Sequence, residues 1–244
     1  MQIALIGYGK MGKAIEDVAL KAGHTVVSRI DFNDDVIKGL AGADVAIEFT
    51  HPGAAKSNIL KCFEAKVPVV VGTTGWYHDF DEIKKLAESS GNSLFYATNF
   101  SLGVNMFFEL NKHLAQLMNH HHMYEPEMTE IHHLQKQDAP SGTAITLAEG
   151  LIANLDRKKS WVNQDGETKI ENQPLELNII SKREGEVPGT HTITYKSDID
   201  EIIITHQAYN RLGFATGAVK AAEWIKDKIG VYTMADLLGY KNKR

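Results

Sequence analysis

The chain has 244 residues, enough for one large domain or two modest ones, and its 43% hydrophobic and 23% charged residues are ordinary for a soluble globular protein. Its net charge of −5 argues against nucleic-acid binding, and no apolar run approaches the roughly eighteen residues that a membrane span requires. The single cysteine, Cys62, excludes an internal disulfide framework, and a start without an export signal predicts a cytoplasmic protein with no membrane partner.

An apolar strand, a glycine-rich turn and a helical pattern follow one another at the start of the chain. The strand is Gln2 to Ile6, the helix is Lys13 to Ala22, and the turn between them consists of Gly7, Tyr8, Gly9, Lys10, Met11 and Gly12. In the dinucleotide-binding fingerprint the first glycine permits the turn, the second lets the backbone approach a pyrophosphate, and the third allows close helix–strand packing. A second strand, Thr25 to Ile30, ends in Asp31, where the fingerprint expects an acid that binds the ribose. We therefore predict a nucleotide site, against the alternative of a bare Rossmann-like turn.

Strands and helices continue to alternate up to about residue 100. The predicted strands are Ala43 to Phe49, Val67 to Val71 and Ser93 to Ala97, and the predicted helices are Gly53 to Ala65 and Asp79 to Ser89. This order predicts an α/β fold with a Rossmann-type parallel sheet, in which ligands bind beyond the carboxyl ends of the strands. Candidate contacts for ribose and nicotinamide at those ends are Gly72, Thr73, Thr74, Ala97, Thr98, Asn99 and Phe100.

The second half of the chain begins with a long helical pattern, Leu102 to Met118, and later becomes rich in strands: Glu176 to Ser181, His191 to Ser197 and Glu201 to Ala208. This pattern predicts an α+β domain with a mixed or antiparallel sheet. A last long helix, Ala218 to Ile229, is expected to return to the first sheet. We therefore expect a nucleotide-binding domain at 1–102 and 213–244, and a substrate-binding and oligomerisation domain at 103–212. We predict no metal site, because the three consecutive histidines at 120–122 cannot all face one ion.

The stretch from Glu130 to Ala144, E-I-H-H-L-Q-K-Q-D-A-P-S-G-T-A, is dense in groups that move protons or hold anions. It leaves a predicted strand, Met128 to His132, and enters a helical pattern with Ser141 as the expected N-cap. Free N–H groups at a helix N-terminus bind anions, and a nearby lysine adds a positive charge. We expect an anion site made by Ser141, Gly142, Thr143 and Lys136. The alternative is an ordinary loop whose histidines lie near a core.

Together these residues resemble the 4-hydroxy-tetrahydrodipicolinate reductase (dihydrodipicolinate reductase) family of the diaminopimelate route to lysine. The resemblance spans nearly the whole chain, and the fifteen-residue motif from Glu130 to Ala144 is highly specific for it. The other matching motifs are G-Y-G-K-M-G at Gly7 to Gly12, G-T-T-G at Gly72 to Gly75, N-F-S-L-G-V-N at Asn99 to Asn105, and R-x-x-F-x-x-G-A at Arg211 to Ala218.

The resemblance implies an NAD(P)H-dependent reduction of a cyclic unsaturated dicarboxylate, in which the ring receives a hydride and then a proton. It implies that His132 donates the proton and that Lys136 is a second donor or an electrostatic stabiliser; which of the two delivers the proton stays open. The implied substrate contacts are His133, Ser141, Gly142, Thr143 and Arg211. For Arg211 a surface ion pair is an equal alternative. The family is typically tetrameric, so we expect a homotetramer.

The sequence departs from the family's pattern at the cofactor site. Many members carry a basic residue just after the acid that ends the second strand, where it can meet a 2′-phosphate, but here Phe32 and Asn33 follow Asp31. An acid without an adjacent base suits a free ribose diol, so we expect NADH to be used at least as well as NADPH. Two alternatives are an amino-acid or semialdehyde dehydrogenase of similar build and a catalytically inert nucleotide-sensing module. The proton-handling residues argue against the second alternative.

Overall fold

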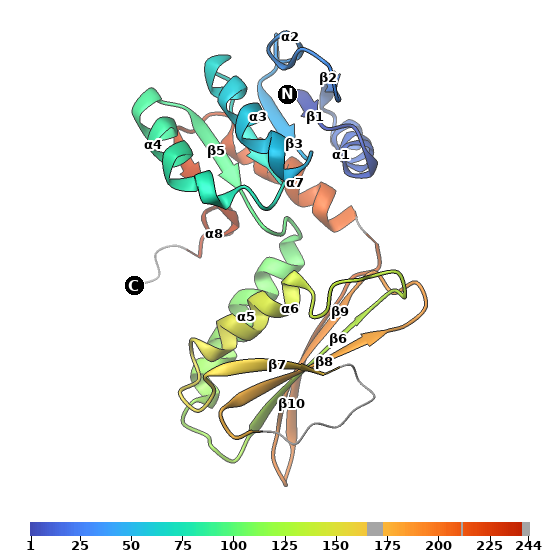
Figure 1. Ribbon diagram of the computed structural model, residues 1–244, viewed down its shortest axis with the longest axis vertical. Coiled ribbons are helices and arrows are strands. Elements are labelled where there is room, and N and C mark those ends of the chain that lie inside the picture. The colour runs from blue at the N-terminus through green and yellow to red at the C-terminus, as the bar shows by residue number, and fades with distance from the viewer. Residues whose placement is uncertain (165–172, 211, 241–244) are drawn as a thin grey trace. The chain divides into compact units, whose positions relative to one another are not determined.

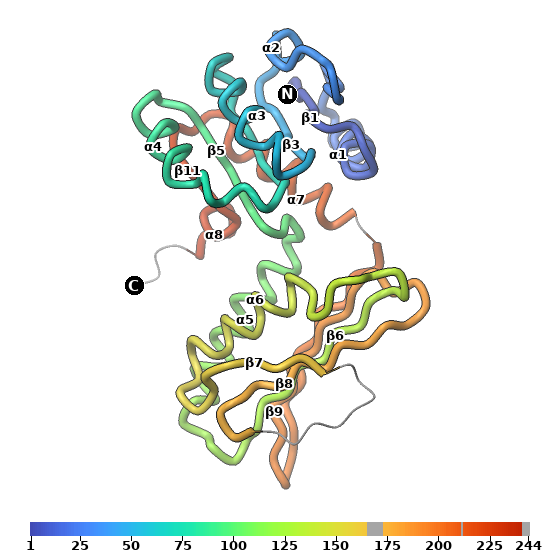
Figure 2. Tube along the Cα trace, in the orientation of Figure 1, coloured from blue at the N-terminus to red at the C-terminus, as the bar shows by residue number. Residues whose placement is uncertain are grey.

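The chain divides into two compact units. The computed structural model describes residues 1–164, 173–210 and 212–240. The first unit consists of Met1–Leu102 and the segment from Leu212, and the second of Gly103–Arg211, so the chain leaves the first unit once and returns to it (Figure 1 and Figure 2). Within the described residues, no helix combines the length and apolarity needed to span a membrane.

The first unit is built on a six-stranded sheet with the order β11-β5-β4-β3-β1-β2. Every neighbouring pair of strands is parallel, which confirms the predicted Rossmann-type sheet. The strands are β1 (Gln2–Ile6), β2 (Thr25–Ile30), β3 (Val45–Glu48), β4 (Val69–Val71), β5 (Ser93–Tyr96) and β11 (Gly230–Tyr232). The helices are α1 (Lys10–Lys21), α2 (Val36–Gly39), α3 (Pro52–Glu64), the 3-10 turn η1 (Tyr77–Asp79), α4 (Phe80–Ser90), α7 (Leu212–Ile225) and α8 (Met234–Leu237).

Helices cover both faces of this sheet, so its strands are apolar on both sides. One core cluster joins Ile3 and Leu5 of β1 to residues of α1 and α7, and the other joins Ala4 and Ile6 to residues of α2, α3 and α4 (Figure 1). The predicted return of the terminal helix to the first sheet is thereby confirmed. Because both faces of the sheet are buried, polar side chains gather at the ends of its strands.

Helix α7 begins earlier than its sequence predicts. The prediction of a start at Ala218 is wrong, since α7 begins at Leu212. Gly217 lowers the helix propensity of this stretch, but it also allows the helix to pack closely: a Cβ at residue 217 would lie 1.6 Å from the carbonyl oxygen of Phe100. The short elements α2 and β11 were not predicted, because segments of 4 and 3 residues carry too little periodicity.

The second unit is built on a five-stranded mixed sheet with the order β10-β9-β6-β8-β7. Strand β9 pairs antiparallel with both β10 and β6. Strand β8 pairs parallel with β6, and β7 pairs parallel with β8, as the predicted mixed sheet requires. The strands are β6 (Glu125–His132), β7 (Ser160–Gln164), β8 (Glu176–Arg183), β9 (Thr190–Lys196) and β10 (Glu201–Gln207). Helices α5 (Leu102–Met118) and α6 (Gly142–Ile152) contribute to the core that covers one face. The central strand β6 leads directly into the motif that the sequence singles out.

Candidate active site

A pocket of about 570 Å³ lies beside the glycine-rich turn of the first unit. The turn supplies Gly7, Tyr8 and Gly9 to its wall, and Asp31 lines it at the end of β2. Phe32 and Asn33, which the sequence placed where a 2′-phosphate would lie, also line it. The lining residues that the sequence did not indicate are Asp34 after β2 and Ser57, Asn58 and Lys61 on α3. The pocket brings together the predicted turn and the predicted ribose-binding acid, and Asp34 adds a second carboxylate beside Asp31.

The three glycines of the turn meet different surroundings. Gly7 has φ +92°, and a Cβ on it would lie 2.1 Å from the carbonyl oxygen of Phe49. A Cβ on Gly12 would lie 2.3 Å from the carbonyl oxygen of Gly7, so both glycines are needed for packing. Nothing lies within 4 Å of a Cβ on Gly9, which is the N-cap of α1. The backbone at Gly9 is therefore open to a ligand, and the helix N-terminus behind it favours an anion such as a pyrophosphate.

The arginine that precedes the pocket acid is already engaged. Arg29 forms an ion pair with Glu16 of α1 and lies 5.8 Å from the ring of Tyr8, whose hydroxyl also donates to Glu16. Lys10 lies at the exposed start of α1, and Met11 is half-buried there. The positive charge of Arg29 is thus neutralised by a buried carboxylate on the side of α1.

The other predicted cofactor contacts follow the neighbouring strands β4 and β5. The side chain of Thr73 is buried, where its hydroxyl accepts from the backbone of Thr50 at 2.7 Å. Phe100 belongs to the core, with its ring 5.7 Å from that of Phe49, so it can offer a ligand only its backbone. The remaining predicted contacts at these strand ends are half-buried Gly72 and Asn99, exposed Thr74 and Thr98, and buried Ala97.

One buried acid beneath these strand ends was not predicted. Glu48 of β3 is 0% exposed, and its Oε1 accepts from Thr50 and, at 3.3 Å, from the amide of Asn58. Burial raises the pKa of Glu48 against the lowering effect of these neutral donors. Glu48 therefore links two residues of the pocket wall, Thr50 and Asn58, from inside the fold.

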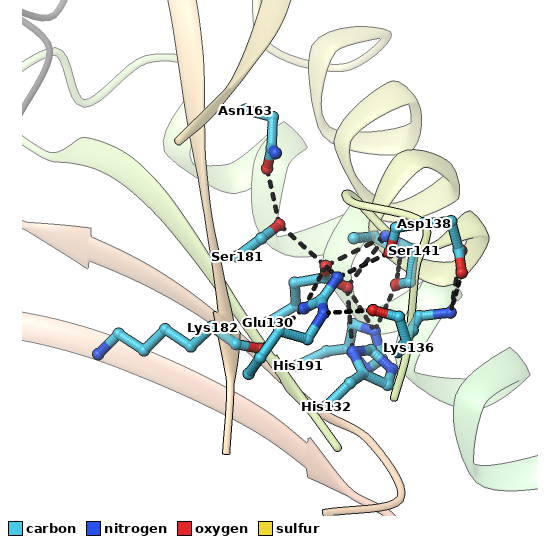
Figure 3. Close-up of polar contacts among 11 residues, drawn as sticks. Glu130, His132, Lys136, Asp138, Ser141, Asn163, Ser181, Lys182 and His191 are labelled. Atoms are coloured by element: carbon cyan, nitrogen blue, oxygen red, sulfur yellow. Dashed lines mark hydrogen bonds and ion pairs between the residues drawn. The ribbon is translucent and has the colours of Figure 1, made fainter. Parts of the chain in front are cut away.

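In the second unit, the strand register assembles a buried polar cluster around Glu130 (Figure 3). Glu130 of β6 lies directly opposite His191 of β9 and Ser181 of β8. Two residues further along the same strands, His132 pairs with Arg183. Residues opposite one another point to the same face of a sheet, so these side chains converge. Glu130 is 0% exposed, and the Oγ of Ser181 donates to its Oε1 at 2.9 Å.

Cations and hydrogen-bond donors surround this carboxylate. The Nδ1 of His132 lies 3.3 Å from Oε2 of Glu130, the Nη2 of Arg183 lies 3.4 Å from Oε1, and the backbone N–H of Ser141 donates at 3.1 Å. Burial by itself raises the pKa of Glu130, but the hydrogen bonds from His132, Ser141 and Ser181 outweigh it and hold that pKa well below its usual range. Glu130 is therefore a buried carboxylate that stays charged.

His191 is the neutral member of the cluster. Burial, with the neighbouring charge of His132, lowers the pKa of His191 to about 3. Its Nε2 lies 3.1 Å from the Oγ of Ser141, and that oxygen also accepts from the backbone of Ala144 at the start of α6. The predicted N-cap at Ser141 is confirmed, whereas the predicted free N–H of Ser141 is wrong, because that group donates to Glu130. At the same helix end, nothing lies within 4 Å of a Cβ on Gly142, so its backbone is open to a ligand.

Lys136 lies on the loop between β6 and α6 and is only 20% exposed. Its ammonium donates to both carboxylate oxygens of exposed Asp138, at 2.8 and 2.9 Å, and this contact lowers the pKa of Asp138 (Figure 3). His133 is half-buried beside it. Arg211, the remaining predicted substrate contact, lies outside the described residues. The second unit thus places His132 and the Ser141 turn on one buried carboxylate, with Lys136 on the loop that joins them.

Sequence reasoning named neither Glu130 nor His191 nor Arg183 as a site residue. Glu130 stands in the matched motif two residues before His132, which is the spacing that puts both side chains on one face of a strand. That spacing was the available signal. His191 and Arg183 are 61 and 53 residues away from Glu130 in sequence, and only the strand register brings them to it.

Glu130, His132 and His191 offer ligand atoms within 4.8 Å of one another, a spacing that could hold a metal ion. However, the carboxylate oxygens of Glu130 already accept from Ser141 and Ser181 and face the guanidinium of Arg183. A metal ion would have to displace these donors and approach a cation. The arrangement therefore fits a hydrogen-bonded network better than a metal centre.

Comparisons with known proteins agree with this geometry. Residues 1–100 match the family model described as dihydrodipicolinate reductase, N-terminus, and residues 103–238 match that of the C-terminus. A 4-hydroxy-tetrahydrodipicolinate reductase of Christiangramia forsetii is 47% identical over 99% of this chain and all of its own length. One of Neisseria gonorrhoeae is 37% identical over 93% of this chain and 85% of its own.

Among solved structures, dipicolinate-bound dihydrodipicolinate reductase from Paenisporosarcina sp. TG-14 superposes with a TM-score of 0.79 at 20% identity, covering 97% of this chain and 98% of its own. At that identity the superposition supports the fold alone. The two family matches and the near full-length relatives confirm the resemblance that the sequence motifs indicated, and the chain belongs to the dihydrodipicolinate reductase family.

Proposed function

We propose that this protein is an oxidoreductase that reduces 4-hydroxy-tetrahydrodipicolinate to tetrahydrodipicolinate with a nicotinamide cofactor, a step of lysine and diaminopimelate biosynthesis. The family membership and the two near full-length reductase relatives support this activity. The observation that carries it to particular residues is the buried Glu130, which faces His132 and accepts from the N–H of Ser141, with Lys136 on the loop between these two residues. That arrangement suits a dicarboxylate that must receive a proton.

The first unit fits a dinucleotide. The open backbone at Gly9, the N-terminus of α1 behind it and the acid-lined pocket beside it match a pyrophosphate followed by a ribose. A bound reduced nicotinamide supplies the hydride. In this proposal the residues of 1–102 and 213–244 form the nucleotide-binding domain, and those of 103–212 hold the substrate.

Within the second unit, His132 would hand over the proton from Nε2. Its Nδ1 faces Glu130 at 3.3 Å, so the charged carboxylate orients the ring. Gly189 packs beside the opposite nitrogen, where a Cβ would lie 3.0 Å from Nε2 and crowd it. Lys136 keeps a positive charge close to the substrate and stabilises negative charge as it develops on the ring.

The N-terminus of α6 would hold a substrate carboxylate through the backbone of Gly142 and Thr143, with His133 and Lys136 beside it. The role of Ser141 would be to shape this turn, since its N–H and hydroxyl are committed to Glu130, Ala144 and His191. Arg211 is the candidate for the other carboxylate, because a guanidinium binds a carboxylate through two parallel hydrogen bonds.

For the cofactor we propose that NADH is used at least as well as NADPH. Asp31 and Asp34 line the pocket, and two carboxylates repel a 2′-phosphate. Arg29 is neutralised by Glu16, which leaves Lys61 as the cation among the pocket's described lining residues. Steady-state kinetics with both cofactors test this preference, and a catalytic efficiency more than tenfold higher with NADPH would contradict it.

We also propose the homotetramer that the family resemblance implies. The sheet of the second unit has one face covered by α5 and α6, whereas Ile203 of β10, which points to the other face, is 52% exposed. On that face the hydroxyls of Thr192 and Thr205 lie 3.1 Å apart and Ile203 pairs with Thr194, which gives a surface of apolar and hydroxyl side chains. Analytical ultracentrifugation of the protein and of Ile203→Lys tests it: the variant should dissociate, and an unchanged mass would exclude this face.

Two glycine variants test the two binding sites against each other. Gly9→Val should abolish NADH binding by blocking the backbone, while Gly142→Val should weaken binding of pyridine-2,6-dicarboxylate and spare NADH. Neither added Cβ meets a neighbour within 4 Å, so both variants are expected to fold. Each variant is the control for the other in calorimetry. If Gly9→Val binds NADH normally, the turn is not the pyrophosphate site.

Turnover itself is followed by the loss of NADH absorbance when freshly generated 4-hydroxy-tetrahydrodipicolinate is added. Lys136→Ala should lose roughly 10²- to 10⁴-fold in kcat and keep its affinity for NADH, since electrostatic and acid–base contributions have that size. Unchanged turnover at saturating substrate would remove Lys136 from the mechanism.

A further inference from the structure

Arg183, at the end of β8, is a charged residue of the cluster that the proposed mechanism leaves without a role. Its Nε donates to the carbonyl oxygen of Lys136 at 3.2 Å, and its Nη2 donates to that of Asp138 at 2.7 Å. Its Nη1 donates to the carbonyl oxygen of Lys182 at 2.8 Å. Nη1 and Nη2 both face Oε1 of Glu130, at 3.5 and 3.4 Å. The guanidinium thus joins the buried carboxylate to the backbone of the loop that carries Lys136.

These contacts use the whole donor capacity of the side chain. A guanidinium has five N–H groups in one plane, and the five contacts above account for one on Nε and two on each Nη. Arg183 is therefore not arranged to bind a substrate carboxylate, because no donor is left for it. A lysine at this position could keep the charge next to Glu130, but its point-like ammonium could not reach the same carbonyl oxygens in the same plane.

Within the part of the chain that the structure describes, the loop that Arg183 holds makes few other contacts. Within it, the backbone N–H of Lys136 bonds to the carbonyl of His133 at 3.1 Å, and that of Leu134 bonds to the carbonyl of Gly185 at 3.2 Å. Asp138, whose side chain is 63% exposed, accepts from the ammonium of Lys136. The position of the ammonium relative to His132 and the Ser141 turn therefore depends on the backbone of residues 136–138. Arg183 holds this backbone by donating to the carbonyl oxygens of Lys136 and Asp138.

We propose that Arg183, anchored on buried Glu130, is a positioning residue that fixes the loop carrying Lys136 and so aims its ammonium at the substrate. This inference rests on the proposed role of Lys136 in the reduction. Through Glu130 the same anchor also reaches His132 and the N–H of Ser141. The proton donor, the cation and the anion-binding turn then keep their relative places because one ion pair holds all three.

The test is a double-mutant cycle of Arg183→Lys and Lys136→Ala on the full-length protein, with kcat, the KM for both substrates and the melting temperature measured for each variant. Arg183→Lys keeps the charge beside Glu130 and removes the planar clamp. It should lower kcat roughly 10²-fold, the size expected for an ångström-scale misplacement of a catalytic group, and leave the KM for NADH unchanged. In the Lys136→Ala background the same substitution should change kcat by less than about twofold. Lys182→Ala, which alters the exposed neighbouring cation, is the matched control and should behave as the parent.

The outcomes separate this inference from the proposed function. If Lys136→Ala loses turnover but Arg183→Lys does not, or if the two losses multiply in the double variant, Arg183 does not act through Lys136 and the inference is overturned. If Lys136→Ala keeps full turnover, the proposed role of Lys136 fails first and takes the inference with it. If the melting temperature of Arg183→Lys is much lower than the parent's, kcat is measured at a temperature at which all variants of the cycle are folded, with the same expectation.

Discussion

Glu48 of β3 and Glu130 of β6 are both 0% exposed, one in each unit, yet their pKa values move in opposite directions. Burial pushes both upward, because a carboxylate loses hydration in either unit. Glu48 has hydroxyl and amide donors from Thr50, Thr73 and Asn58, and its pKa is raised. Glu130 has His132 and Arg183 as well as donors from Ser141 and Ser181, and its pKa is lowered.

The difference shows that the partners of a buried acid, and not burial alone, decide the direction in which its pKa moves. Neutral donors around Glu48 offset only part of its lost hydration, and among the described residues its Oε2 has no hydrogen-bond partner. The cluster around Glu130 supplies cations, which favour the charged carboxylate. A buried acid that stays charged can orient a proton donor, whereas a buried acid with a raised pKa serves mainly to join neighbouring polar side chains.

The largest effect should come from removing the charge at Glu130. Glu130→Gln keeps the shape of the side chain but leaves His132 and the guanidinium of Arg183 without their counter-charge. Breaking a buried pair from one side costs about 3–5 kcal/mol, so we expect a loss of that order in the free energy of unfolding, together with loss of turnover. Urea unfolding, monitored by hydrogen exchange of the β6 amides, measures this loss in the free energy of unfolding.

Glu127→Gln is the matched control for that experiment, since Glu127 lies on the same strand but is exposed. It should leave both stability and turnover near the parent's. A Glu130→Gln protein as stable as the control would mean that the cluster around Glu130 contributes no net stability, and the contrast with Glu48 would lose its basis.

A second effect of intermediate size should appear on acidification. The folded pKa of His191, about 3, lies below its ordinary value of 6.5, so its stabilising contribution is complete above pH 6.5 and is lost as the pH falls toward 3. The lowered pKa of Glu130 acts in the same direction from about pH 4.5 downward. The raised pKa of Glu48 acts in the opposite direction: its contribution is complete below about pH 4.5 and is lost as the pH rises through the folded pKa.

Acidification from pH 7 to pH 4 should therefore weaken the sheet of the second unit more than that of the first. For His191 alone the slope is at most about 1.4 kcal/mol per pH unit. Hydrogen exchange of β6 and β9 compared with β3 and β4, corrected for the intrinsic rate at each pH, measures the difference. Equal loss of protection in both units would contradict the opposite directions assigned to the two glutamates.

The two sites also differ in how far the sequence predicts them. The nucleotide turn depends on backbone conformation within Gly7 to Gly12, and the N-cap at Ser141 depends on residues three apart, so both are local patterns that the sequence reveals. The sheets were predicted in type because strand periodicity and the alternation with helices are also local. Such patterns identified the elements and the ends of strands where ligands bind.

The cluster around Glu130 could not be predicted in the same way. His191 and Ser181 reach Glu130 through the registers of β9 and β8, and a shift of one residue in either strand would turn their side chains to the other face. The sequence contains no local signal for that register. Glu48 was not predicted because in the sequence it is part of an apolar strand. The expectation of a free N–H at Ser141 was wrong because the sequence does not show that this group lies against Glu130.

A smaller effect should follow from Ser141→Ala. The substitution removes the cap of α6 and the contact with His191 but leaves the backbone N–H of residue 141 bonded to Glu130. Loss of an N-cap costs about 1 kcal/mol, so the free energy of unfolding should fall by that amount while turnover changes little. Ser141→Thr, which can still cap the helix, is the control. A loss of turnover with Ser141→Ala beyond tenfold would indicate that the hydroxyl itself contacts the substrate.

The smallest effect at neutral pH should come from Glu48→Gln. The amide keeps an oxygen for Thr50 and Asn58 and removes a carboxylate that is costly to ionise, so stability at pH 7 should stay within about 1 kcal/mol of the parent's or rise. The parent loses the contribution of Glu48 as the pH rises through its raised pKa, and the variant should lack that decline. Exposed Glu64 on α3 provides the control Glu64→Gln, whose stability should follow the parent's at every pH. If Glu48→Gln instead destabilised the first unit by as much as Glu130→Gln destabilises the second, Glu48 would have to be a charged, compensated group, and the neutral donors around it could not explain that.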